Sequence, residues 1–112
     1  MIDQAQLLKG LLEGCILEII SRGETYGYQI TEDLNQFGLK SLNEGSVYPV
    51  LIRLQKKGFL YSKSKASPLG PKRKYFYLTE EGHIYLDAFK KVWEDLSGVV
   101  TTIMKGETYG TI

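Results

Sequence analysis

The chain has 112 residues, a formal net charge of +1 and 43% hydrophobic residues, enough apolar material for one packed domain and too much for a disordered tail. It opens with no secretory leader pattern, and no stretch approaches the roughly 18 apolar residues of a membrane span. The single cysteine, Cys15, lies among apolar residues and has no disulfide partner within the chain. These features predict a soluble protein of the reducing cytoplasm.

Two helices are predicted in the first third of the chain. The first should be capped by Asp3 and stop at Gly23, and its apolar stripe recurs at three- and four-residue steps: Leu8, Leu11, Leu12, Cys15, Ile16, Ile19 and Ile20. The second should cover residues 26–37 and end at Gly38, with an inward face of Ile30, Leu34 and Phe37. Only a short link separates the two helices.

A third helix is predicted from the apolar stripe Val47, Val50, Leu51 and Leu54, with Asn43 as its cap and Gly58 just past its end. Pro49 lacks an N–H group and is tolerated only in the first turn of a helix. Either this helix begins near Ser46, or one backbone hydrogen bond is missing near its start. The residues left facing outward are Ser46, Tyr48, Pro49, Ile52, Arg53 and Lys56.

A β-hairpin and a long final helix complete the predicted elements. Aromatic-rich segments at residues 59–65 and 74–78 indicate two strands joined by a loose tip at residues 66–71. Thr79 should cap a helix that extends to about Met104 and carries a coiled-coil-like stripe of Phe89, Val92, Leu96, Val99 and Ile103. So small a domain has no partner for this stripe, so we expect a second copy of the protein to cover it.

The expected fold is therefore mainly α with a small β-hairpin. Residues 1–78 would form a winged helix-turn-helix domain whose N-terminal helix also contacts the dimer partner. Residues 79–104 would form a C-terminal dimerisation helix, and residues 105–112, which lack a periodic apolar pattern, a frayed tail.

Charge is distributed unevenly along the chain. Residues 45–79 contain eight basic residues and no Asp or Glu, which leaves six basic and thirteen acidic residues elsewhere. Such segregation is typical of a surface that binds a polyanion, and a helix beside a basic hairpin suits double-stranded DNA. The predicted DNA-binding residues are Ser46, Tyr48, Pro49, Arg53, Lys56, Lys72, Arg73 and Lys74. Alternatively, Tyr48 covers the edge of the core, and Arg53 and Lys56 are ordinary solvated charges.

Three separated segments carry a family resemblance. Residues 26–30 (YGYQI), 45–54 (GSVYPVLIRL) and 72–82 (KRKYFYLTEEG), in this order and spacing, resemble the PadR family, and the length is similar to its short subfamily. The resemblance implies a winged-helix homodimeric repressor that binds a near-palindromic operator, with the last helix of each subunit packed against the first and last helices of the other. The implied interface residues are Leu8, Leu12, Phe89, Val92, Trp93, Leu96, Val99 and Ile103.

Trp93 is the only tryptophan of the chain and lies beside the stripe of the final helix. In some multidrug-sensing family members a tryptophan at the matching place lines a pore between subunits and stacks on flat aromatic drugs. Phe89 and Trp93 are therefore candidate ligand-binding residues for a planar aromatic molecule. The alternative is that Trp93 only fills the dimer seam.

Catalysis is not expected from this sequence. The only histidine, His83, and Cys15 do not form a suggestive pair, no metal-ligand cluster is present, and no glycine-rich loop for a cofactor follows a strand. A winged helix can also act as a protein-interaction or RNA-binding module without operator specificity. The acid-free basic segment favours nucleic acid over protein, and a groove-entering helix favours DNA over RNA.

Overall fold

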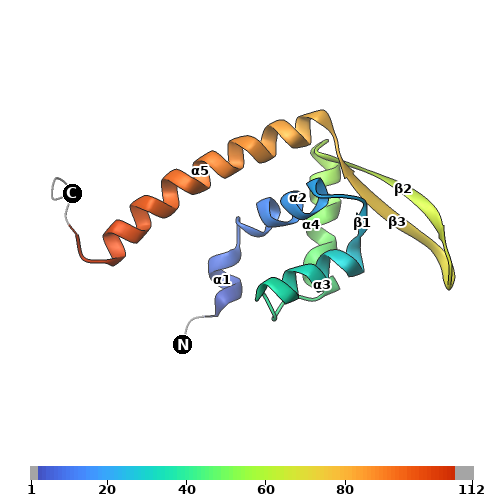
Figure 1. The fold of residues 1–112 in the computed structure, drawn as a ribbon, viewed down its shortest axis with the longest axis horizontal. Coiled ribbons are helices and arrows are strands. Elements are labelled where there is room, and N and C mark those ends of the chain that lie inside the picture. The colour runs from blue at the N-terminus through green and yellow to red at the C-terminus, as the bar shows by residue number, and fades with distance from the viewer. Residues whose placement is uncertain (1–2, 108–112) are drawn as a thin grey trace.

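The computed structural model describes residues 3–107, which form five helices and one three-stranded antiparallel sheet. The head of the molecule contains α1 (Gln4–Leu8), α2 (Leu12–Ser21), β1 (Thr25–Tyr26), α3 (Gly27–Phe37), α4 (Glu44–Lys56), β2 (Leu60–Ser67) and β3 (Gly70–Leu78). The long helix α5 (Glu80–Met104) extends from this head to one side, and the β2–β3 hairpin extends to the other (Figure 1). The predicted mainly helical architecture with a hairpin and a long C-terminal helix is confirmed.

The first predicted helix is divided into α1 and α2, so the expectation of one continuous helix was wrong. Asp3 caps α1 as expected, because its Oδ1 accepts a hydrogen bond from the Ala5 N–H at 3.0 Å. Gly10 then adopts a φ of 83°, a left-handed conformation that glycine allows without strain and that breaks the helix. The apolar stripe continues across the break, so periodicity alone gave no sign of it.

The boundaries of α3 and α4 follow the predicted caps. Gly38 ends α3 with a φ of 122°. Asn43 caps α4, since its Oδ1 accepts a hydrogen bond from the Ser46 N–H at 3.0 Å. Because α4 begins at Glu44, Pro49 lies in its second turn, and the N–H that would bond to the Gly45 carbonyl is missing.

The strands are longer than predicted, and the sheet has a third member. Strand β3 is central, in the order β1-β3-β2, and the two-residue strand β1 pairs Thr25 with Phe76. The β2–β3 pairing extends to Ser67 opposite Gly70, with an irregularity between Lys65 and Ser67. The tip is therefore a short turn rather than a loose loop.

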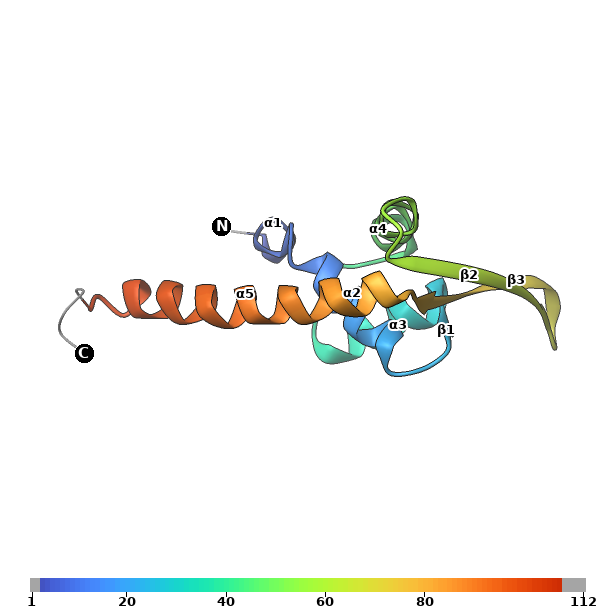
Figure 2. The same ribbon diagram turned by 90° about the horizontal axis from the view of Figure 1, so that it is seen from above.

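Buried residues from α2, α3, α4 and the sheet form one core, and α5 reaches it only at its start. Phe76, Leu51 and Leu54 are among its fully buried side chains, whereas the buried residues of α5 are Gly82 and Leu86. Beyond its first two turns, which contain Gly82 and Leu86, helix α5 extends away from the rest of the molecule (Figure 2). Gly106 closes α5 with a φ of 79°, and residues 108–112 of the expected frayed tail lie outside the described residues.

Candidate nucleic-acid interface

Helix α4 turns its apolar stripe inward and its polar residues outward, as predicted. The stripe residues Val47, Val50, Leu51 and Leu54 are buried. Tyr48 keeps 43% of its surface exposed, and Pro49 and Lys56 are also exposed. Ser46 is half-buried, and its hydroxyl lies 3.3 Å from Oδ1 of the capping residue Asn43. The exposed side of α4 is therefore available to an external partner.

Two cations at the C-terminal end of α4 contact a carboxylate from another helix. Oε2 of Glu13 in α2 lies 3.4 Å from Nζ of Lys57 and 3.7 Å from Nε of Arg53. Arg53 is thus more than a solvated charge, although half of its side chain remains exposed. Lys57 was missing from the predicted site, and Glu13 lies too far away in the sequence for any local pattern to pair it with α4.

The consecutive cations Lys72, Arg73 and Lys74 do not act as one cluster. Successive side chains of a strand point to opposite faces, so Lys72 and Lys74 share the face of buried Phe76, and Arg73 lies on the other face. The guanidinium of Arg73 lies over the ring of Tyr26, 4.0 Å from its centroid, which is a cation–π contact. The hairpin therefore presents positive charge on both of its faces.

Two further cations, Lys63 and Lys65, lie on the same face as Arg73 and were not named as site residues. Their ammonium groups lie 5.7 and 6.0 Å from the ring centroid of Tyr77. Glu24 accepts hydrogen bonds from Lys65 and, at 2.7 Å, from the Tyr77 hydroxyl. These hydrogen bonds, first that of Lys65, lower the pKa of Glu24 and keep its carboxylate ionised. Lys63 and Lys65 both lie in the acid-free segment 45–79, and this position in the sequence could have indicated them as site residues.

The predicted residues of α4 and of the hairpin meet at a concave surface. A pocket of about 230 Å³ lies between the start of α3, the start of α4 and strand β3. Tyr48, Arg73 and Lys74 all line it, together with Tyr26 and Tyr28. Helix α4 and the hairpin therefore form one continuous surface rather than two separate ones.

A second hollow lies along α5. This groove of about 460 Å³ is mostly apolar, and Leu8, Phe89 and Trp93 of the predicted interface line it. Leu12, also of the predicted interface, is half-buried and packs partly against the core. Farther along α5, the exposed apolar side chains are Val92, Leu96, Val99, Val100, Ile103 and Met104. The final helix thus presents an apolar face with no partner within the described residues.

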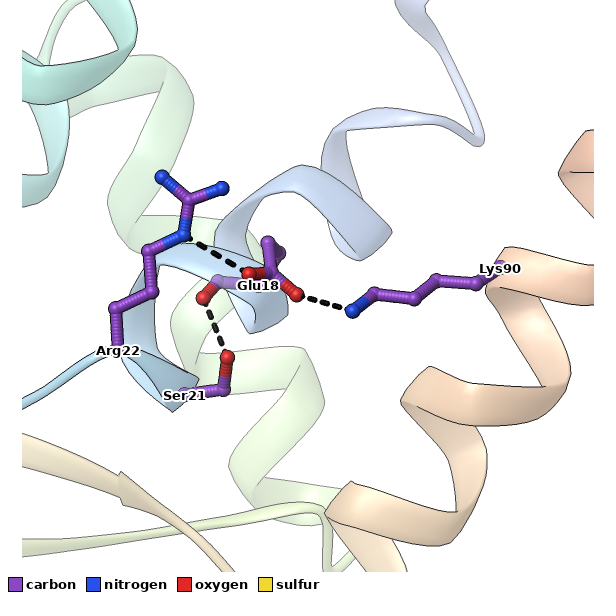
Figure 3. A network of polar contacts seen from close by, with 4 residues as sticks. All are labelled: Glu18, Ser21, Arg22 and Lys90. Carbon is purple, nitrogen blue, oxygen red and sulfur yellow. Dashed lines mark hydrogen bonds and ion pairs between the residues drawn. The ribbon is translucent and has the colours of Figure 1, made fainter.

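Polar contacts join α2 to α5 at this groove. Glu18 of α2 accepts a hydrogen bond from Nε of Arg22 at 2.9 Å and pairs with Nζ of Lys90 in α5 at 2.6 Å (Figure 3). These contacts, first that with Lys90, lower the pKa of Glu18 below its ordinary value. Helix α5 is therefore fixed to α2 by charge as well as by apolar packing.

None of the described helices combines the length and the apolar character needed to cross a membrane. Within residues 3–107, no group of three His, Cys, Asp or Glu side chains is arranged to hold a metal ion.

Comparison with known proteins identifies the chain. The model of the transcriptional regulator PadR-like family matches residues 16–88. The crystal structure of a PadR-like transcriptional regulator from Bacillus cereus shares 48% identity, covers 91% of this chain and 99% of its own, and has a TM-score of 0.81. The crystal structure of a Streptococcus transcriptional regulator shares 41% identity, covers 88% of this chain and 97% of its own, and has a TM-score of 0.79. An uncharacterized protein from Lysinibacillus sphaericus is 30% identical over 108 residues, or 92% of this chain and 96% of its own. The chain therefore belongs to the PadR-like family of transcriptional regulators, a non-enzymatic family whose members bind DNA.

Proposed function

We propose that the protein is a homodimeric repressor that acts in the cytoplasm and binds a near-palindromic operator. The observation that carries this proposal is the acid-free segment 45–79, whose residues Tyr48, Arg73 and Lys74 line one pocket between α4 and the hairpin, beside Glu44 at the start of α4. An α-helix fits the major groove of B-DNA, and flanking cations neutralise phosphates beside it. Helix α4 is therefore the recognition helix, and the β2–β3 hairpin is the wing.

The two parts of this surface have different tasks. Tyr48 and Pro49 lie exposed near the start of α4, the end of a recognition helix that usually approaches base edges. The wing cations contact phosphates, which positions the protein but carries little sequence information. The proposed DNA-binding residues are Ser46, Tyr48, Pro49, Arg53, Lys56, Lys72, Arg73 and Lys74.

The dimer forms through α5. Its apolar stripe has a coiled-coil step and stays exposed, with 51% of the surface of Leu96 accessible at its centre. The proposed interface residues are Leu8, Leu12, Phe89, Val92, Trp93, Leu96, Val99 and Ile103. A two-fold dimer prefers a palindromic site whose half-sites are about one helical turn, or roughly 34 Å, apart.

A planar aromatic molecule that binds beside Phe89 and Trp93 would release the operator. The support for this part is the apolar groove of about 460 Å³ that both side chains line, with 46% of the surface of Trp93 exposed. Because Trp93 is the only tryptophan, its fluorescence reports directly on this site. Unchanged emission across a panel of planar apolar compounds would leave Trp93 as a seam residue only.

Fluorescence anisotropy tests operator binding. A duplex from upstream of the protein's own gene and a scrambled duplex are titrated at several salt concentrations, and we expect selective binding that weakens steeply with salt. Arg73→Ala should weaken binding to both duplexes and reduce the salt slope by about 1. Lys91→Ala, which removes an exposed cation from α5, is the matched control and should change neither.

The same titration tests two alternatives. Transfer RNA that competes as strongly as the operator would favour an RNA-binding module. If neither duplex binds even at low salt, the surface serves a protein partner instead. Equal and weak binding to both duplexes would contradict operator specificity at this site.

A further inference from the structure

The side chain of Glu13 joins three helices. It belongs to α2, and only 12% of the side chain is exposed. Its Oε1 accepts a hydrogen bond from the Tyr85 hydroxyl of α5 at 2.7 Å. Its Oε2 lies 3.4 Å from Nζ of Lys57 and 3.7 Å from Nε of Arg53, both at the C-terminal end of α4.

We infer that Glu13 is a positioning residue that holds Arg53 and Lys57 ready for phosphate contact and links them to α5 through Tyr85. This inference rests on the proposed function. Arg53 approaches the carboxylate through Nε, so the terminal amino groups of its guanidinium are left for a phosphate. The two cations keep 52% and 45% of their side chains exposed, and an approaching phosphate meets them before it meets Glu13.

The charge of this cluster remains positive although it contains an acid. One carboxylate faces two cations, so its repulsion of a phosphate is more than balanced. Arginine and lysine side chains are long, and they lose conformational freedom whenever a contact orders them. Because Glu13 orders both of them before DNA arrives, part of that cost is removed from the binding step.

The link to α5 depends on Tyr85, whose position is fixed by aromatic packing. Its ring stacks on Phe59 with the centroids 4.3 Å apart, and lies 6.3 Å from that of Phe89. Phe89 lines the groove proposed for the dimer partner and the ligand. A rearrangement of Phe89 therefore reaches the recognition helix through Tyr85 and Glu13.

The test is the operator affinity of Glu13→Gln. Loss of a negative charge near DNA would by itself tighten the binding of every duplex. The inference gives the opposite sign: operator binding should weaken roughly tenfold, the loss expected when a charge-assisted contact is no longer prepared. Asp87→Asn is the matched control, because it removes one negative charge from an exposed position of α5 that forms no ion pair among the described residues. Its operator affinity should stay within about twofold of the unmodified protein.

Two further variants separate positioning from folding. Tyr85→Phe keeps the ring stacked on Phe59 but removes the hydroxyl that orients Glu13, and it should weaken operator binding about threefold. In a chain that already carries Arg53→Ala and Lys57→Ala, Glu13→Gln should no longer weaken operator binding. If Glu13 had only a structural role, Glu13→Gln would weaken operator binding in that chain as well.

The outcomes distinguish this inference from the proposed function. Selective operator binding by the unmodified protein, together with equal or tighter binding by Glu13→Gln, would overturn the inference and leave the proposed function standing. A loss in Glu13→Gln that persists without Arg53 and Lys57 would also overturn it. Unselective binding by the unmodified protein would overturn both.

Discussion

Replacement of Gly82 by alanine sets two effects against each other at the start of α5. Alanine in a helix interior is favoured over glycine by about 1 kcal/mol, so helix propensity predicts a more stable protein. A Cβ atom at Gly82 would, however, lie well inside the van der Waals distance of the Phe59 carbonyl oxygen and 3.0 Å from the Phe59 carbonyl carbon. These are backbone atoms, and no side-chain rotation can move them aside.

The structure gives the size of the net effect. The contact would have to open by about 1 Å to reach an ordinary separation. This movement disturbs two hydrogen bonds, from the Thr79 hydroxyl to the Gly58 carbonyl at 2.7 Å and from the Thr79 N–H to the Phe59 carbonyl at 3.1 Å. Each bond contributes about 1 kcal/mol, and overpacking costs about 1–3 kcal/mol. After the propensity gain, the free energy of unfolding should fall by about 2–4 kcal/mol.

Urea unfolding followed by circular dichroism at one protein concentration measures this change. Gly98→Ala is the matched control, because Gly98 lies in the middle of α5 and a Cβ there would meet no atom within 4 Å. The control should gain about 1 kcal/mol of stability from helix propensity. If Gly82→Ala is as stable as the unmodified protein, the close packing of α5 on Phe59 is refuted.

Three further predictions concern the core, the proposed dimer and an ion pair. Leu54→Ala, at a fully buried position, should lower the free energy of unfolding by about 2–5 kcal/mol in the same assay, and an unchanged midpoint would contradict its place in the core. Leu96→Glu puts a charge into the exposed stripe of α5 and should give a monomer in light scattering with its helix content retained, whereas a surviving dimer would argue against this interface. The lowered pKa of Glu18 means that its ion pair with Lys90 contributes stability above the ordinary pKa of 4.5, and that the contribution disappears as the pH falls through the lower folded-state pKa. Acid should therefore destabilise the unmodified protein more than Glu18→Gln, and parallel stability curves would contradict this.

Much of the fold was predictable because helix signals are local. The apolar residues of α4 repeat within one helix, and the caps Asn43 and Thr79 bond to N–H groups three residues away. The same property explains the errors. Gly10 breaks the first helix within an unbroken apolar pattern, and the two-residue strand β1 is too short to show a period.

The site was predictable in its composition more than in its arrangement. The acid-free run of residues 45–79 indicates a polyanion-binding surface because charge can be counted along a chain. Strand alternation, which separates Arg73 from Lys72 and Lys74, follows only after the extent of β3 is known.

The amino-acid sequence by itself determined the helical stripes, the caps, the segregation of charge and the family resemblance, because each follows from the order and spacing of residues along the chain. Only the tertiary structure decided which charges meet. Glu13 pairs with Lys57 and Glu24 with Lys65 across more than forty residues of sequence. Such pairs form because the packing of the core brings distant elements within a few ångströms, and no local pattern specifies that approach.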